Sequence, residues 1–491
     1  MTEYILDLST VAWEAITPAL IVGVGSLVVL IVSLAAHERA ARLPAAVSLL
    51  FIVVAAAFAL QLWGAGAAYC FGNAVAMDPL GTYLQIVVLA ATALVILLSI
   101  GQLPAEGIAF KEYYALILLA TCGMLLLVSS NDLLMIFLGV ELAAIPTYVL
   151  AGMARGRLRS NEAALKYFLL GAFAAGFLLY GIALMYGGTG TTTLNQMAIV
   201  VGRGAAKPPF VLAGIALIVV GLGFKAALAP FHFWAPDVYQ GAPTPVTAFI
   251  AAGPKAALYA PLIRIFLVAL PTMHDEWASV LWVVAVLTMT VGNVVAIAQR
   301  DIKRMLAYSS IAHAGYILVG IIAGGELGIR AIVFYAVVYV VATLGAFGTV
   351  IALSRKGGAV RIEDYTGLGF KRPWLGIAMA LFMISLAGIP PAAGFLGKFY
   401  LFSAAVKAGF VGLAVIGVLN SVVSVYYYLR IVVLLYMREA KEAEGPAPAR
   451  AGLEWVSATV AVTGVATLWL GVYPSFVLSS ATQALPQFFR F

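Results

Sequence analysis

Charged side chains are scarce in this chain. They make up 10% of its 491 residues, whereas soluble globular domains carry about 25%. Hydrophobic residues make up 64%, and the mean hydropathy is +1.06. This balance excludes a soluble globular protein. It predicts an all-α integral membrane protein, because helices satisfy their own backbone hydrogen bonds in lipid.

Cysteine is also nearly absent. Cys70 and Cys122 are the only two, and neither has the spacing of a disulfide framework or a metal site. The sequence lacks histidine pairs at haem-like placement, and it lacks a glycine-rich phosphate loop after a strand, since we expect no strands at all. We therefore expect no redox cofactor in this chain.

Long apolar runs are what the sequence has in abundance. A membrane-spanning helix needs about 20 such residues. We count about fourteen spans, at 15–36, 45–64, 78–101, 111–129, 131–151, 161–187, 210–240, 243–270, 277–298, 303–323, 327–354, 373–407, 411–437 and 452–472. The connections between them are polar loops, so we predict a single transmembrane domain over residues 1–491.

Two of these spans are too long to be single straight helices. Residues 210–240 and 373–407 number 31 and 35, which would be about 46 and 52 Å of helix. The first contains Pro230 and the second contains Pro390 and Pro391. Proline removes a helical hydrogen bond, so the freed carbonyls need a cavity, a side chain or water. We predict a broken helix at each site.

Broken helices in corresponding positions of two halves are typical of transporters built from inverted repeats. We therefore expect two inverted five-helix repeats, at about 111–270 and 277–437. Residues 1–110 would form N-terminal helices, and residues 438–491 would hold the C-terminal helix. Two proline-kinked packing helices remain the alternative.

Basic residues crowd alternate loops. Seventeen lie in loops on one side: Arg39, Arg42, Lys111, Arg155, Arg157, Arg159, Arg300, Lys303, Arg304, Arg355, Lys356, Arg361, Lys371, Arg372, Arg438, Lys441 and Arg450. The other side holds four: Arg203, Lys207, Lys407 and Arg490. The positive-inside rule places the seventeen in the cytoplasm and, for an even number of spans, both termini in the periplasm. This bias explains the net charge of +7 through a basic face toward anionic lipid, without nucleic acid.

Ionisable side chains inside the spans are the candidate functional residues. We select six that lie well inside apolar runs: Glu141, Lys166, Lys225, Lys255, His313 and Lys398. A charge at bilayer depth costs about 2.5–3.5 kcal/mol, so four lone charged lysines would cost about 10–14 kcal/mol. A partner charge, a water-filled cavity or loss of the proton usually offsets that cost. Together such groups typically form a proton path.

Glu141 is ten residues from either end of its span, which is about 15 Å. Lys166 lies on the next helix, and helices pack about 8–10 Å apart, so its long side chain could reach this carboxylate. We predict a Glu141–Lys166 pair, with a static buried bridge as the alternative. Arg264 lies nearer a span end, and we expect its side chain to extend to the membrane surface.

Lys225 and Lys255 should lie near the membrane midplane, and neither has an obvious acidic partner. A lysine in such surroundings releases its proton readily, which is what a proton carrier needs. His313 has neighbouring hydroxyls and could bridge Lys255 and Lys398 through water, or it could be a neutral buried residue.

Four motifs resemble the antiporter-like subunits of respiratory complex I. They are LGFK at 222–225, PFHFWAPDVYQGAP at 230–243, EAALKYFLLGAF at 162–173 and LAGIPP at 386–391. The last two, with Gly397-Lys398, are most similar to the N subunit of NADH:quinone oxidoreductase. The resemblance covers roughly residues 111–437. The related M subunit looks to place a glutamate where Lys398 stands.

The resemblance implies a non-redox subunit of a proton-translocating enzyme. It places the six ionisable residues on the positions that carry protons, driven by quinone reduction elsewhere in the complex. Quinone, FMN and iron-sulfur clusters would lie in partner subunits. The partners would be other membrane-arm subunits and lipids, in a bacterial inner membrane.

Two other functions remain open. An Mrp-type cation/proton antiporter subunit would share the fold and the lysines but would use an ion gradient. A passive assembly scaffold would tolerate neutral residues at every buried charge without loss of turnover.

Overall fold

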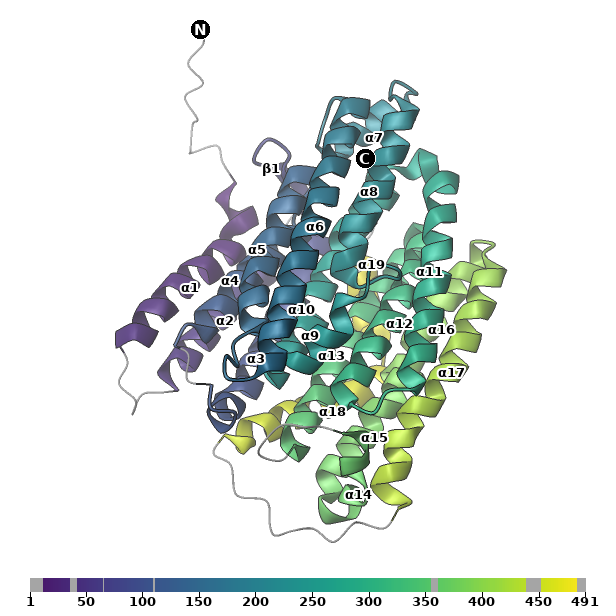
Figure 1. Cartoon of the computed structure of the whole chain (residues 1–491). Helices are drawn as coiled ribbons and strands as arrows, with labels where there is room; N and C mark the ends of the chain where they lie inside the picture. Colours follow the sequence, from purple (N-terminus) through teal and green to yellow (C-terminus); the bar gives the residue numbers. More distant parts are fainter. Residues whose placement is uncertain are drawn as a thin grey trace.

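The chain folds into an elongated bundle of helices that run roughly side by side (Figure 1). The computed structural model describes residues 12–35, 42–64, 66–108, 111–354, 361–438 and 452–483. Its α-helices are α1 (Thr17–Ala35), α2 (Leu43–Gln61), α3 (Pro79–Ala105), α4 (Tyr113–Val128), α5 (Leu133–Ala151), α6 (Leu158–Thr189), α7 (Leu194–Gly202), α8 (Pro208–Ala226), α9 (Trp234–Gly241), α10 (Thr244–Ile263), α11 (His274–Ile297), α12 (Ile302–Ala323), α13 (Gly325–Leu353), α14 (Leu368–Lys371), α15 (Pro373–Ala387), α16 (Ala393–Lys407), α17 (Val411–Tyr436), α18 (Leu453–Val472) and α19 (Ser475–Gln483).

The predicted spans agree with this helix set. Among the described residues, twelve helices are long and apolar enough to cross a membrane, and α4 and α15 are shorter apolar helices. Together these fourteen correspond to the fourteen predicted spans. A π-helical turn, Arg264–Ala269, extends α10. The short helices α7, α14 and α19 were not predicted.

The expectation that the chain has no strands is wrong. Strands β1 (Ala68–Cys70) and β2 (Val75–Met77) form an antiparallel hairpin between α2 and α3. Its turn includes Gly72, whose φ is +63°. The strands are only three residues long, too short for an alternating pattern to stand out in the sequence. Hydrogen bonds from the Ala76 amide to Ser129 and from the Asn131 amide to Ala74 join the hairpin to the α4–α5 connection.

Aspartate begins three of the helices. Asp78 caps α3, Asp132 caps α5 and Asp301 caps α12, each accepting a hydrogen bond from a backbone amide of the first turn. Such a cap satisfies a donor that the helix leaves unpaired and stabilises it by about 1 kcal/mol. These caps fix where α5 and α12 start, and both helices carry predicted site residues.

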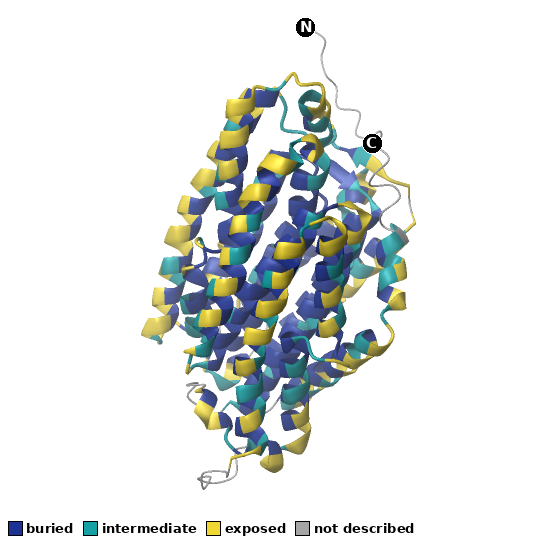
Figure 2. Ribbon diagram, turned by 90° about the vertical axis from the view of Figure 1, so that its right-hand side faces the viewer, coloured by how far each residue is buried: buried dark blue, intermediate teal, exposed yellow. Residues whose placement is uncertain are grey.

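Burial divides the bundle into an inner and an outer set of helices. Nearly all residues of α10, α12 and α13 are buried, whereas much of α1, α2 and α6 is exposed. Figure 2 shows the buried residues along the middle of the bundle and the exposed ones along its outer faces. Lys255 and His313 lie on inner helices, and Lys166 lies on the outer helix α6.

The first predicted break is confirmed. Helix α8 ends at Ala226, and Ala227 follows in the left-handed region with φ +59°. The chain resumes as α9 after Pro230. The Trp234 indole donates a 2.8 Å hydrogen bond to the Phe224 carbonyl, which also accepts one from the Ala227 amide.

The second break is confirmed as well. Helix α15 ends at Ala387, Gly388 takes φ +83°, and α16 begins after Pro390 and Pro391. The Lys398 ammonium donates a 2.9 Å hydrogen bond to the Ala387 carbonyl. A lysine side chain thus satisfies the end of the helix that the prolines interrupt.

Candidate functional site

Glu141 pairs with Lys225, not with Lys166. The Glu141 Oε1 and Lys225 Nζ atoms are 3.1 Å apart, and their side chains are 20% and 7% exposed. The two groups are not aligned for a hydrogen bond, and Glu141 Oε1 has no hydrogen-bond partner among the described residues. The expectation that Lys225 lacks an acidic partner is therefore wrong. The end of α8 brings Lys225 against the middle of α5.

An aromatic stack holds this ion pair in place. Lys225 Nζ donates a 2.7 Å hydrogen bond to the Tyr148 hydroxyl. The Tyr148 ring packs edge-on against Tyr167 at 4.6 Å, and Tyr167 stacks on Trp234 at 4.3 Å. The stack links α5, α6 and the start of α9. A displacement of α9 would therefore be felt at Lys225.

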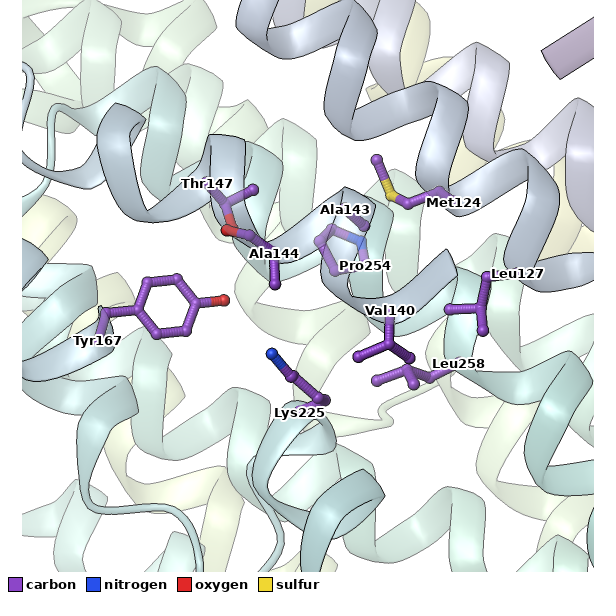
Figure 3. Close-up of a pocket in the computed structure, with 10 residues that line it drawn as sticks. All are labelled: Met124, Leu127, Val140, Ala143, Ala144, Thr147, Tyr167, Lys225, Pro254 and Leu258. Atoms are coloured by element: carbon purple, nitrogen blue, oxygen red, sulfur yellow. The ribbon is translucent and has the colours of Figure 1, made fainter. Parts of the chain in front are cut away.

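A small cavity lies beside Lys225. Its volume is about 20 Å³, and its lining includes Thr147, Tyr167 and Pro254. Figure 3 shows the Lys225 ammonium and the Tyr167 hydroxyl pointing toward one another across it. A cavity of this size has room for about one water molecule. Most of its lining is apolar, and its polar side chains are those of Thr147, Tyr167 and Lys225 itself.

Lys166 lies at the edge of the bundle. Its Nζ is 2.7 Å from Asp237 Oδ2 and 2.6 Å from Glu162 Oε1, and its side chain is 41% exposed. Asp237 also pairs with Arg304, at 2.5 Å. The predicted Glu141–Lys166 pair is therefore wrong. Lys166 lies in the third turn of α6, where its side chain reaches the surface and α9.

Lys255 is buried, and no acidic side chain among the described residues pairs with it. Its Nζ donates a 2.8 Å hydrogen bond to the Ser310 carbonyl and a second one to the Ser310 hydroxyl. That hydroxyl is also 2.6 Å from the Tyr339 hydroxyl and 3.2 Å from the Tyr239 hydroxyl. Neutral groups alone therefore satisfy this lysine in the described part of the chain.

His313 lies one turn beyond Ser310 on α12 and is 5% exposed. Its Nδ1 is 2.5 Å from the Tyr335 hydroxyl, and its Nε2 is 3.1 Å from the Tyr428 hydroxyl. Ser309 also contacts Tyr428 through its hydroxyl. Both ring nitrogens thus have hydroxyl partners, one on α13 and one on α17. Such groups can pass a proton in either direction.

Lys398 is the last of the six predicted residues in the chain, and it lies on α16 just after the second break. Its side chain is bonded to the Ala387 carbonyl and, at 2.9 Å, to the Ser421 hydroxyl. The ammonium also lies 4.9 Å from the centre of the Tyr316 ring. A mostly apolar cavity of about 730 Å³ adjoins it between α16 and α17.

The expectation that the Arg264 side chain extends to the membrane surface is wrong. Its guanidinium makes two hydrogen bonds to Asp78, at 2.6 and 2.9 Å, and its side chain is 3% exposed. The π-helical turn at the end of α10 carries it toward the start of α3. A bidentate pair of this kind needs both groups in fixed positions. The N-terminal helices are thereby joined to the helix that carries Lys255.

The structure adds residues that the sequence analysis missed. Asp237 contacts Lys166 and Ser310 contacts Lys255 directly, whereas Tyr239 contacts Ser310. Asp237 and Tyr239 lie within the motif at 230–243, just after the first break, which was the available signal. Across the described ranges, no group of three histidine, cysteine or carboxylate side chains could hold a metal ion.

Comparisons with known proteins give one consistent result. The family described as NADH:quinone oxidoreductase/Mrp antiporter, TM, matches residues 130–424. NADH-quinone oxidoreductase subunit N of Trichlorobacter lovleyi is 46% identical over 484 residues, which cover 97% of this chain and 97% of the relative. The protein of that name in Chloroflexus aggregans is 43% identical over 439 residues, covering 88% of this chain and 89% of the relative.

Solved structures agree. A chain of respiratory complex I from Thermus thermophilus with bound aureothin superposes with a TM-score of 0.80 at 37% identity, covering 95% of this chain and all of that one. A chain of the Mrp complex from Dietzia sp. DQ12-45-1b gives 0.83 at 24% identity over 96% of this chain and 97% of that one, which shows a shared fold. The chain therefore belongs to the NADH:quinone oxidoreductase/Mrp antiporter family of transmembrane subunits and, within it, groups with the N subunits of NADH-quinone oxidoreductase.

Proposed function

We propose that the chain is a proton-translocating, non-redox subunit in the membrane arm of complex I. The observation that carries this proposal is the set of ionisable groups buried in membrane helices. Glu141 and Lys225 form one pair, Lys255 binds Ser310 and Lys398 binds the broken helix. Groups so costly to bury are retained where protons or ions move.

The six predicted residues divide between these roles. Lys225, Lys255 and Lys398 are proton carriers in this proposal, and Glu141 is the charge that tunes Lys225. His313 connects hydroxyl groups of α13 and α17. Lys166 acts from the edge of the bundle through Asp237, and not directly on Glu141.

The remaining features of the proposal concern the assembly. The energy would come from quinone reduction in partner subunits that hold the quinone, FMN and iron-sulfur clusters. The chain would lie in a bacterial inner membrane with both termini in the periplasm. Its central helices would form two inverted repeats, and each repeat would contain one of the two broken helices.

The alternatives are less well supported. The Mrp likeness at 24% identity concerns the fold, whereas the relative at 46% identity is a subunit N. A passive scaffold would gain nothing from a buried Glu141–Lys225 pair, because well-packed apolar residues often stabilise a protein as much or more.

The test is whether Lys225 must release its proton. Lys225→Ala removes the carrier, and Lys225→Arg keeps a charge that is not released at working pH. We expect both variants to lose most quinone-linked proton pumping in membrane vesicles that contain the whole complex. Complex content is checked by native gel.

Lys207 provides the matched control, because it is exposed in a loop before α8. Lys207→Ala and Lys207→Arg should pump normally. Full pumping by Lys225→Arg would remove the proton-carrier role. Full pumping by both Lys225 variants would favour the alternative that the chain is a passive assembly scaffold.

A further inference from the structure

The short helix α9 contacts both halves of the buried charge series. It follows the first break directly and is eight residues long. On the side of the first half, Trp234 stacks on Tyr167 and donates to the Phe224 carbonyl, next to Lys225. Asp237 pairs with Lys166. The position of α9 is therefore tied to α6 and to the end of α8.

The same helix is fixed to α12 by several further contacts. Asp237 pairs with Arg304 at 2.5 Å, and Gln240 donates a 3.2 Å hydrogen bond to Asp301. Both contacts lie at the start of α12. The Tyr239 hydroxyl reaches deeper, to 3.2 Å from the Ser310 hydroxyl. Helix α9 thus spans the distance between the Glu141–Lys225 pair and the residue that binds Lys255.

Ser310 stands at a junction of three groups. Its hydroxyl accepts from Lys255 and lies within hydrogen-bond distance of Tyr339 and Tyr239. A serine hydroxyl has one donor and two acceptor sites. With three neighbours, all of these sites are used, and the direction of the hydroxyl hydrogen is determined by the two tyrosines. Removal of one tyrosine hydroxyl leaves one of these sites unfilled. The serine hydrogen can then turn toward the lysine once its amine is neutral, because an ammonium group cannot accept a hydrogen bond.

We infer that α9 couples the Glu141–Lys225 pair to Lys255, with Tyr239 as the positioning residue that acts on Lys255 through Ser310. The inference rests on the proposed proton-translocating function and deepens it. A shift of α9, produced when the Glu141–Lys225 pair changes its protonation, moves the Tyr239 hydroxyl and changes how well the Ser310 hydroxyl accepts the hydrogen bond from Lys255. The Trp234–Tyr167 stack transmits the shift.

The test is Tyr239→Phe in the whole complex. This change keeps a buried ring, which is packed against Trp234 and Phe347, and removes only the hydroxyl. We expect the number of protons pumped per electron to fall at least twofold while complex content is unchanged. Tyr113→Phe is the matched control, because Tyr113 is a fully buried tyrosine on α4 bonded to Ser99. It should leave the ratio unchanged.

A double-mutant comparison separates positioning from packing. If Tyr239 acts only through Ser310, then Ser310→Ala combined with Tyr239→Phe should be no worse than Ser310→Ala alone. An additive loss, or a normal ratio in Tyr239→Phe, would overturn the inference. The Lys255→Ala variant distinguishes a failure of the proposed function from a failure of the inference about α9. Normal pumping in that variant would refute the proposed function, whereas lost pumping with a normal Tyr239→Phe would refute only the role of α9.

Discussion

Asp237 is the carboxylate at which two cations from different helices meet. Lys166 of α6 binds one of its oxygens and Arg304 of α12 binds the other, at 2.7 and 2.5 Å. The carboxylate itself is 30% exposed. Exposed ion pairs are usually worth about 0–1 kcal/mol, but a carboxylate shared by two cations holds three helices at once. The main contribution of Asp237 is to position these three helices relative to one another.

The exchange Asp237→Asn should therefore cost more than its exposure suggests. It leaves Lys166 with Glu162 and leaves Arg304 with Gln240 as its remaining side-chain partner. We expect proton pumping to fall about threefold or more, because Lys166 and Arg304 both lose the carboxylate that joins α6, α9 and α12. The measurement is pumping per unit of complex in membrane vesicles.

Glu162→Gln is the matched control, since it removes the other carboxylate of Lys166 without touching α9 or α12. An exposed i,i+4 pair contributes about 0.2–0.5 kcal/mol, so pumping should change by less than about twofold. Equal losses in the two variants would show that only the charge near Lys166 matters and that the link to Arg304 does not.

The burial of most of these charges could be predicted from the sequence, but their partners could not. Lys225, Lys255 and Lys398 are buried as expected, whereas Lys166, also expected to be buried, has a side chain that is 41% exposed. Partner choice depends on how each helix is rotated about its axis. Glu141 therefore met Lys225 from the end of α8, while Lys166 turned outward to Asp237, a residue beyond the break.

At the scale of elements, the two broken helices use their lysines differently. Lys225 lies in the half before the first break, and Lys398 lies in the half after the second. Lys225 takes a carboxylate and a tyrosine as partners, whereas Lys398 takes the free carbonyl of the break itself. Straightening the second break would therefore remove a ligand of Lys398 directly.

Replacing Pro390 and Pro391 together by alanine tests this relation. Alanine restores the missing amides and favours a continuous helix, in which the Ala387 carbonyl would bond within the backbone. We expect pumping to fall at least twofold while assembly is largely retained. Pumping assays with native gels measure both quantities.

The control is Pro44→Ala. Pro44 lies in the first turn of α2, where proline interrupts no helical hydrogen bond. Its pumping should be normal. Normal pumping by the Pro390 and Pro391 double variant would show that the break is a packing feature without a role in transport.

The prolines made both breaks predictable, because proline inside a long apolar run has few other consequences. The β1–β2 hairpin and helix α7 were missed for a different reason. They lie in the connections between spans, where three to nine residues carry too little periodicity to reveal an element. Their positions depend on contacts to distant loops, such as those between β2 and the α4–α5 connection.

At the scale of the molecule, the orientation in the membrane rests on the distribution of basic loops. Six of the basic residues in that distribution lie outside the described residues: Arg39, Arg355, Lys356, Lys441, Arg450 and Arg490. Two exposed arginines allow a test. Arg159 lies in the first turn of α6, beside a loop predicted to be cytoplasmic, and Arg203 lies in a loop predicted to be periplasmic.

Single cysteines at positions 159 and 203 can be introduced after Cys70 and Cys122 are replaced by alanine. We expect a membrane-impermeant thiol reagent to label position 203 from the periplasmic side and position 159 only after the cytoplasmic side is opened, because basic loops stay in the cytoplasm. The reverse labelling pattern would invert the proposed orientation.

The uneven burial of the helices has a consequence for how the chain is made. The deeply buried helix α10, with its π-helical extension, has a mean hydropathy of only 1.4, against 2.5 and 2.6 for α1 and α2 at the surface. A helix with a lysine at its centre partitions poorly into lipid by itself. Helices α3 and α4 pack against α10 and precede it in the chain. Because they are synthesised before α10, we expect them to offer α10 a protein surface in place of lipid when it enters the membrane.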